Sequence, residues 1–316
     1  MKNKKEGTYS LIGNILLLLV AIIWGFGFTF QTIASKNMDG FTLNFLRTLI
    51  GAICLIPVII IKAKINKKPI FEKTKAETKE LLKAGILCGI FLFIGSNFQQ
   101  YGIGLYPEGT ASSGRGGFIS ALYVILVPIC GLVLKNKVKI INWISVIIAM
   151  IGLYFLCFTD GIDNVYLGDL IILCCAFGFA CQILTIDFYA QKVDVIKMSF
   201  IQFLTSSLLS FVCMMIFEKP NVSSILSCWY SVLYLGVISS GLAFTLQIVG
   251  QKYAKNPVIS AIILSLESVF SVLAGVLILK ERLSTYEIIG CSIMFVAILF
   301  SQIPFGKKEE DNKKSV

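Results

Sequence analysis

Long apolar runs separated by short polar segments dominate this chain. Each of ten runs holds roughly the 20 apolar residues that a helix needs to cross a bilayer. The predicted spans cover residues 11–35, 40–62, 81–104, 107–134, 140–159, 167–189, 196–217, 227–251, 257–279 and 284–303. Continuous runs indicate helices rather than the alternating strands of a barrel, because lipid admits only structures that satisfy their own backbone hydrogen bonds. The pattern predicts an all-α integral membrane protein.

The distribution of Lys and Arg predicts the orientation of these spans. If the loops alternate sides from a cytoplasmic N-terminus, 22 of the 28 basic residues lie in cytoplasmic segments. Eight Lys lie in residues 62–83, which we interpret as a topology-setting loop with a short solvated helix; a lipid-binding polybasic segment is the alternative. Residues 280–282 are the exception, with two bases on the other side. We expect a multi-pass inner or plasma membrane protein with both termini cytoplasmic (1–10 and 304–316) and an uncleaved first span.

Composition narrows the classes of function. The chain is 56% hydrophobic and 15% charged, which leaves no water-soluble core. Its net charge of +10 follows from the cytoplasmic Lys, so we expect no nucleic-acid partner. It has no His, and its ten Cys show no C-x-x-C spacing, which argues against a metal site, a cofactor or enzymatic catalysis. The expected partners are a small-molecule substrate, the lipid bilayer and, if transport is coupled, protons; a monomer and a homodimer both remain open.

The two halves of the sequence resemble each other. Residues 13–16 (GNIL) match 168–171 (GDLI) at a shift of 155, which also brings Asp39 onto Asp194. Near the ends of the halves the shift becomes 145 and places 135–138 on 280–283. Each half has five predicted spans, so the second enters the membrane from the opposite side. The sequence predicts ten transmembrane helices as two inverted five-helix repeats, 11–159 and 160–303, around a central cavity.

Polar residues three or four positions apart mark helix faces that turn away from lipid. Eight spans carry such faces, and the fifth and tenth do not, so we place those two at the periphery. The alternative is that amides and hydroxyls only join helices. The candidate substrate-binding residues are Trp24, Phe28, Asn44, Arg47, Asn97, Gln100, Tyr101, Arg115, Tyr123, Gln182, Gln202, Gln247 and Glu267.

Three of these candidates are charged. Arg47 and Arg115 present planar forks of donors suited to a carboxylate or phosphate; the alternative is that they pair with Glu108 or backbone carbonyls, or extend toward the interface. Glu267 lies near the middle of its span, where a carboxylate is costly unless it is protonated, paired or hydrated. It is predicted to bind a substrate ammonium group or to carry a coupling proton, with a structural role as the alternative.

The segment SLESVFSVLAGVLILKERLSTYEIIGCSIMFVAIL (265–299) resembles the signature of the EamA family of the drug/metabolite transporter superfamily. Further similarity lies in IIWGFGFTF (22–30) and GFISALYVILVP (117–128). The family's usual Leu-Glu-Pro stands here as Leu-Glu-Ser at 266–268, and the first repeat has Leu122 where the second has Glu267. The resemblance covers the whole chain. It implies ten helices in two inverted repeats and, for most members, export of amino acids, other metabolites or drugs.

These observations predict a permease that works by alternating access, exporting a small metabolite, an amino-acid-like compound or a drug, with proton coupling left open. An importer of the same fold is the first alternative. A channel is a second, although no ring or filter of repeated ligands is evident. A transport-inactive sensor is a third. An enzyme would need a nucleophile with its base or a metal-ligand cluster, and neither is found.

Overall fold

The structure of the protein is a computed structural model that describes residues 2–67, 69, 74–107, 112–134, 138–157, 166–279 and 285–301. These residues form helices and short connections, and no strand occurs among them. Within the described residues, two apolar helical stretches, Ile140–Gly152 and Ile288–Ser301, stand at the places of the predicted fifth and tenth spans. Eight segments are long and apolar enough to cross a membrane: Tyr9–Ser35, Gly40–Ile65, Lys75–Gly104, Gly116–Val133, Leu167–Tyr189, Val195–Phe217, Trp229–Ala254 and Pro257–Ile278. The chain is therefore a multi-pass membrane protein.

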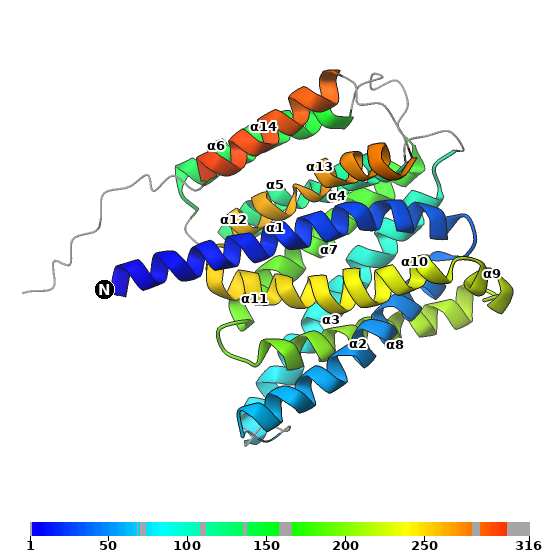
Figure 1. Cartoon of the computed structure of the whole chain (residues 1–316), viewed down its shortest axis with the longest axis horizontal. Helices are drawn as coiled ribbons and strands as arrows, with labels where there is room; N and C mark the ends of the chain where they lie inside the picture. The colour runs from blue at the N-terminus through cyan, green and yellow to red at the C-terminus, as the bar shows by residue number, and fades with distance from the viewer. Residues whose placement is uncertain are drawn as a thin grey trace, which may run out of the picture.

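The helices follow one another in an antiparallel bundle (Figure 1). The first half contains α1 (Lys2–Ser35), α2 (Gly40–Ile65), α3 (Lys75–Gly104), α4 (Ser112–Ala121), α5 (Tyr123–Val133) and α6 (Ile140–Cys157). The second half contains α7 (Leu167–Tyr189), α8 (Val195–Phe217), α9 (Val222–Ser227), α10 (Trp229–Leu233), η1 (Tyr234–Phe244), α11 (Thr245–Ala254), α12 (Pro257–Leu264), α13 (Glu267–Ala274), η2 (Gly275–Leu279) and α14 (Thr285–Ser301). The loop at 280–282 and the tail at 304–316, both used in the topology prediction, lie outside the described residues.

Side-chain caps fix where several helices begin. The α3 helix starts at Lys75 with a capping box, in which Thr74 accepts a hydrogen bond from the backbone of Glu77 and Glu77 accepts one from the backbone of Thr74. The Lys- and Glu-rich segment at 75–83 therefore forms the first turns of α3 instead of a separate short helix. Asp194 and Asn256 cap α8 and α12 without a return bond, each accepting two backbone N–H bonds with its side chain.

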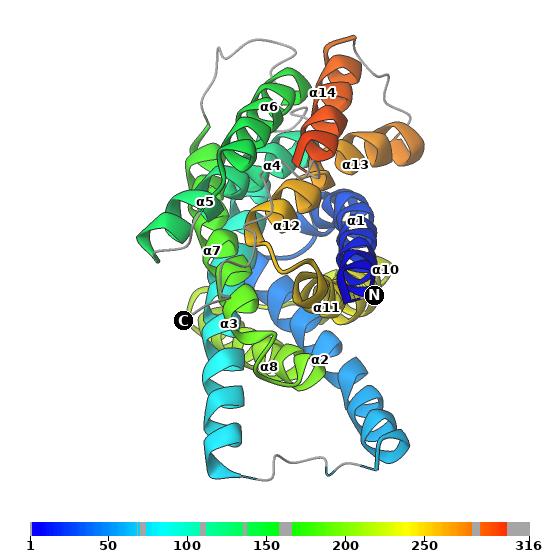
Figure 2. The same ribbon diagram turned by 90° about the vertical axis from the view of Figure 1, so that its left-hand side faces the viewer.

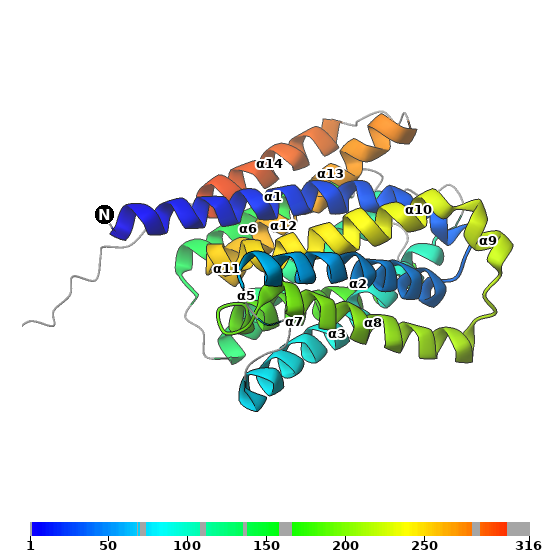
Figure 3. The same cartoon turned by 60° about the horizontal axis from the view of Figure 1, so that its bottom comes forward.

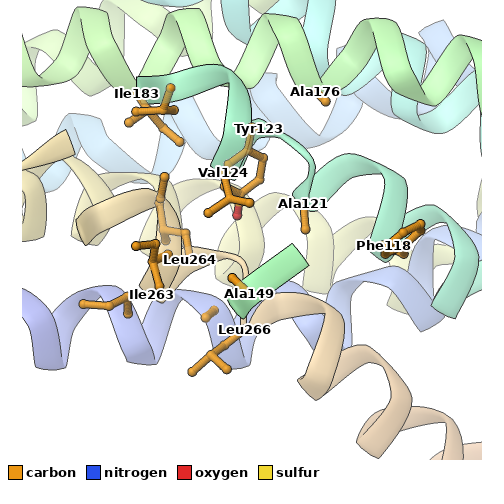
Figure 4. Close-up of a cluster of buried hydrophobic side chains, with 14 of the residues drawn as sticks. Phe118, Ala121, Tyr123, Val124, Ala149, Ala176, Ile183, Ile263, Leu264 and Leu266 are labelled. Carbon is orange, nitrogen blue, oxygen red and sulfur yellow. The ribbon is translucent and has the colours of Figure 1, made fainter. Parts of the chain in front are cut away.

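Two predicted spans are interrupted at matching places. The fourth breaks at Leu122, between α4 and α5, and the ninth breaks at Ser265 and Leu266, between α12 and α13. A shift of 145 residues, the one that relates the ends of the two halves, brings the first break within one or two residues of the second. Figure 4 shows the interrupted segments facing each other, with Tyr123 and Val124 on one side and Leu264 and Leu266 on the other. At both breaks the backbone stays in the right-handed helical region but tightens, with i→i−3 hydrogen bonds from Leu122 to Ile119 and from Leu266 to Ile263.

The packing of the helices joins the two halves throughout the bundle. The most extensive contacts link α3 with α7, α2 with α8, and α6 with α14, and α1 packs against α11 and α13. Figures 1 and 2 show α6 and α14 side by side at one edge of the bundle, away from α2 and α8. In Figure 3, α2 lies between α11 and α8. Each of the contacting pairs α3–α7, α2–α8, α6–α14, α1–α11 and α1–α13 contains one helix from each half.

Close backbone approaches occur at glycines that the repeat relates. A Cβ atom at Gly13 would lie 2.7 Å from the carbonyl oxygen of Gly250, and one at Gly168 would lie 2.6 Å from that of Gly102. Real Cβ atoms do not come so near to backbone, so only glycine permits these contacts of α1 with α11 and of α7 with α3. The sequence match between Gly13 and Gly168 thus corresponds to a matching structural role.

Polar contacts tie the α2–α8 pair at both ends. At one end Lys62 donates to Asp194 at 2.7 Å, the only ion pair between side chains in the described part of the chain. At the other end the Glu218 carboxylate accepts hydrogen bonds from the backbone N–H groups of Phe41 and Thr42, both at 2.8 Å. It also accepts from the hydroxyls of Thr42 and Tyr101, at 2.8 and 2.9 Å. Glu218 therefore caps the start of α2 from the opposite half.

Candidate functional site

A buried polar cavity lies between the two halves. Its described lining comes from seven of the ten predicted spans, and no described side chain of α6 or α14 contributes to it. The α8 helix supplies none of the described lining residues, so fewer spans reach the cavity than the eight predicted. The lining residues are Trp24, Phe28, Gln31, Arg47, Gln99, Tyr123, Phe179, Gln182, Ile183, Ser239, Phe244, Gln247 and Glu267.

The cavity is narrow in this conformation. The atom-free space among its lining side chains sums to about 430 Å³, but the part wide enough for the centre of a water-sized sphere is about 20 Å³. That space holds about one water molecule. Small-molecule pockets usually measure about 300–1,000 Å³, so the lining residues must move apart before a metabolite fits.

Arg47 on α2 is buried in this lining, with 3% of its surface exposed. Its Nε donates to the Ser240 hydroxyl at 3.2 Å, and its Nη1 is buried without a hydrogen-bond partner. No carboxylate among the described residues lies within ion-pair distance. A buried charge without a counterion is costly, and the open Nη1 donor faces a site where an anionic group would compensate it.

Glu267 is the first residue of α13, directly after the interruption of the ninth span, and is 4% exposed. The buried Tyr123 hydroxyl on α5 lies within interaction range of its carboxyl group, although no hydrogen bond of standard geometry joins them. A carboxyl group buried in a membrane span is costly unless it is protonated, paired or hydrated.

Three glutamines bring further unpartnered oxygens to the cavity. Gln31, Gln182 and Gln247 each have a side-chain oxygen that is buried and has no hydrogen-bond partner. Most buried polar atoms in proteins are paired, so such atoms require an explanation. Together with Arg47 Nη1, four polar atoms of lining residues are buried without a hydrogen-bond partner. They provide donors and acceptors for a polar ligand or for ordered water.

Aromatic rings form the apolar walls of the cavity. Trp24 packs against Phe244 with ring centroids 4.6 Å apart, and its Nε1 donates to the backbone oxygen of Ser239 at 3.2 Å. Phe28 and Phe179 complete the apolar lining. Because the Trp24 donor is occupied, its ring presents an apolar surface. The cavity thus combines one cation, one carboxyl group, amide oxygens and aromatic faces.

The structure brings seven of the thirteen sequence candidates into this lining: Trp24, Phe28, Arg47, Tyr123, Gln182, Gln247 and Glu267. Five others, Asn44, Asn97, Gln100, Tyr101 and Gln202, are not among its described lining residues. Asn44 donates to Asn97 and to the backbone of Ser96. Gln202 accepts from Gln182 at 3.1 Å, directly behind the lining.

The remaining candidates lie elsewhere in the bundle. Gln100 donates to the backbone oxygen of Gln31 at 3.3 Å. Asn97 and Tyr101 line a separate lateral groove. The backbone of Arg115 lies in α4, and its side chain is outside the described part of the structure, as is Glu108.

Sequence reasoning missed several lining residues, among them Gln99, Phe179 and Ser239. Gln99 is buried and donates to Ser120 at 3.0 Å. It neighbours Gln100 in sequence, and spacing alone does not identify which of two adjacent amides faces the cavity. Phe179 follows Gly178, whose close approach to Gly95 sets the rotation of α7 against α3. That contact between halves is not visible in either helix alone.

Comparisons with known proteins agree with this architecture. A curated protein of Archaeoglobus fulgidus described as an uncharacterized transporter is 29% identical over 297 residues, covering 93% of this chain and 87% of its own length. A second uncharacterized transporter of that organism is 23% identical over 292 residues, covering 92% and 98%. A solved crystal structure superposes with a TM-score of 0.71 at 18% identity, covering 94% of this chain and 96% of that one, and shows the fold alone.

The family comparison is the more specific one. The model of the EamA-like transporter family matches this chain twice, over residues 11–158 and 166–302. Together the two matches span nearly all the helices that surround the cavity. The chain belongs to the EamA-like transporter family, within the drug/metabolite transporter superfamily.

Proposed function

We propose that this chain is a secondary transporter that exports a small metabolite, an amino-acid-like compound or a drug across the inner membrane by alternating access. The observation that carries the proposal is the cavity itself, in which Arg47 and Glu267 face one space without ionic partners. Arg47 suits an anionic group of the substrate, and Glu267 suits a cationic group or a coupling proton. The aromatic walls accommodate an apolar portion. An importer of the same fold would use the same site.

The packing of the halves supports alternating access. If two inverted repeats are related by a pseudo-two-fold axis, each contact between halves must have a counterpart. The contact of α3 with α7 is then equivalent to that of α11 with α1, and the contact of α5 with α7 to that of α13 with α1; all four occur. The same axis exchanges α2 with α8 and α6 with α14, so each of these two pairs is its own counterpart. Such pseudo-symmetry gives two conformations of similar energy, one open to each side.

Uptake by proteoliposomes that contain the purified protein tests the proposal. A panel of radiolabelled amino acids and related metabolites is measured with and without a pH gradient, and then by counterflow without a gradient. We expect Glu267→Gln to abolish stimulation by the gradient, because the amide cannot exchange a proton, while counterflow persists. Glu80→Gln, on the exposed first turns of α3, is the matched control. An unchanged response to the gradient in Glu267→Gln would remove proton coupling from the proposal.

The role of Arg47 has its own test. A charge-assisted hydrogen bond contributes about 1.5–3 kcal/mol. Arg47→Gln should therefore raise the half-saturation constant for a carboxylate substrate by roughly 10-fold or more. Lys62→Gln removes a cation from the same helix outside the cavity and should leave the half-saturation constant unchanged. Equal effects of the two variants would contradict direct binding by Arg47. Single-channel currents across planar bilayers would instead favour a channel.

A further inference from the structure

A second hollow, distinct from the central cavity, lies on the side of the bundle. We call it the lateral groove; it is formed by α2, α3, α7 and α8 and lined by Phe41, Phe93, Ile94, Asn97, Phe98, Tyr101, Ile171 and Phe217. Its atom-free space is about 840 Å³, of which about 430 Å³ admits the centre of a water-sized sphere. The groove is therefore open in the conformation in which the central cavity is nearly closed.

The wall of the lateral groove is an aromatic frame. The Phe41 ring lies 6.3 Å from Phe93, 4.9 Å from Tyr101 and 6.1 Å from Phe217, measured between centroids. Tyr101 is held in place by its hydrogen bond to Glu218. Asn97, the one amide in the lining, donates to Phe93 and Ser210 and accepts from Asn44. The groove therefore offers a preformed apolar surface whose polar groups are already paired.

The position of the lateral groove relative to the membrane indicates what it faces. Phe98 is 42% exposed and Phe217 is 71% exposed, both within predicted spans, so the mouth of the groove opens toward lipid. From Tyr101 to Phe93 the groove follows α3 over about 12 Å, at 1.5 Å per residue. One leaflet contributes about 15 Å of hydrocarbon. The length suits the acyl chain of one leaflet.

The end of the lateral groove nearest the membrane surface, where α2 begins and α8 ends, carries charges of both signs. The exposed Lys219 follows Glu218, and the loop that leads into α2 contains the exposed Lys36 and Asp39. Lys219 and Lys36 suit a phosphate, and Asp39 suits an ammonium group, whereas the Glu218 carboxylate already accepts four hydrogen bonds. Because positive and negative side chains are both present at this end of the groove, it complements a zwitterionic headgroup better than an anionic one.

We propose that the lateral groove binds one zwitterionic phospholipid, with an acyl chain along the aromatic frame and its headgroup at Lys219 and Asp39. This inference is independent of the transported substrate and of Glu267. It predicts a lipid site that exchanges more slowly, and fills at a lower lipid content, than the ordinary lipid contacts of the bundle.

Quenching of tryptophan fluorescence by lipids with brominated acyl chains tests this site. Phe98→Trp places a reporter at the mouth of the groove. Phe211→Trp is the matched control, because Phe211 is 39% exposed and lies six residues from the end of α8, as Phe98 lies six from the end of α3. Both variants exchange one exposed aromatic residue for another. Purified protein in detergent is titrated with brominated phosphatidylethanolamine or brominated phosphatidylglycerol, and the signal of the three native Trp is subtracted.

We expect Phe98→Trp to reach half-maximal quenching at a lipid-to-detergent ratio at least fivefold below that of Phe211→Trp, with phosphatidylethanolamine ahead of phosphatidylglycerol. Native mass spectrometry provides a second measurement. Ile171→Trp fills the groove and should lose one bound phospholipid, whereas Leu170→Trp, on the same helix but outside the lining, should retain it. Equal midpoints for the two reporters, a preference for phosphatidylglycerol, or equal lipid retention would each overturn the proposal. So would displacement of the quencher by a transported substrate, which would make the groove a substrate path.

Discussion

Replacement of Glu218 should loosen the contact between the two halves at the start of α2. Its carboxylate accepts four hydrogen bonds, two from the first backbone N–H groups of α2 and two from the hydroxyls of Thr42 and Tyr101. Those N–H groups belong to a helix start and have no partner within the helix. Asp39, the residue at the cap position of α2, makes no side-chain cap bond. Glu218 therefore performs for α2, from the other half, the function of an N-cap.

The magnitude of this effect follows from the four bonds. Loss of an N-cap costs about 0.5–2 kcal/mol, and a hydrogen bond to a charged group contributes about 1.5–3 kcal/mol. Glu218 is partly exposed, so water replaces part of what is lost. We expect Glu218→Ala to reduce the free energy of unfolding by about 2–4 kcal/mol, combining the cap and the Tyr101 bond. Glu218→Gln, which keeps one acceptor oxygen, should cost about half as much.

Unfolding in mixed micelles with increasing dodecyl sulfate, followed by circular dichroism, measures this loss. Lys219→Gln, at the adjacent exposed residue, controls for removal of a surface charge. A double-mutant cycle with Tyr101→Phe separates the hydroxyl bond from the cap, and coupling of about 0.5–3 kcal/mol is expected for residues in contact. If Glu218→Ala stays within about 0.5 kcal/mol of the unchanged protein, as an ordinary surface substitution would, the inter-half cap does not stabilise the fold.

Two further predictions concern the same bundle. Gly168→Ala places a Cβ 2.6 Å from the Gly102 oxygen, so the backbones must separate at a cost of about 1–3 kcal/mol; Gly104→Ala, whose Cβ would meet nothing nearer than 3.9 Å, should be neutral in thermal unfolding. Burial alone would raise the pKa of Asp194, but bonds from Lys62 and from backbone N–H groups outweigh it and hold the pKa below its ordinary value. Its stabilisation is thus present at neutral pH and is lost as pH falls below about 4. Lys62→Gln should lessen that loss, and an identical acid-unfolding profile would contradict the assignment.

The hydrophobic pattern predicted the transmembrane character of the chain because the requirement is local. A helix in lipid must be long and apolar along its own sequence, and helices stand at the predicted places from 11–35 to 257–279. The interruptions at Leu122 and at Ser265 were not predicted, although Ser265, Ser268 and Ser271 each donate a side-chain hydrogen bond to the backbone three residues earlier at the second one. No Pro or Gly stands at either break to indicate it in the sequence. The two interrupted spans also contact each other, α4 with α13 and α5 with α12, and no single stretch of sequence reveals such contacts.

The candidate site was predictable to the extent that polarity in an apolar span is informative. Arg47 and Glu267 were evident because charged residues within spans are rare. Asn97, Gln100 and Tyr101 lie on the same polar stretch of α3, yet they face the lateral groove or the backbone of α1. When a helix is buried on more than one side, its amide side chains can form hydrogen bonds with a different neighbour on each side. Helical spacing gives the residues that share a face and leaves open which neighbour that face contacts.

One native cysteine offers a direct test of motion between the halves. Cys54 lies on α2, and a Cβ atom built at Gly241 on η1 would be 3.5 Å from the Cβ of Cys54, within the range that disulfides require. Gly241→Cys should therefore form a disulfide with Cys54 on oxidation. If the halves rock against each other, this bond stops transport and reduction restores it, whereas Gly241→Cys combined with Cys54→Ser stays insensitive to oxidant. Complete disulfide formation with undiminished transport would mean that α2 and η1 move together, and the sliding surface would then lie between other helices.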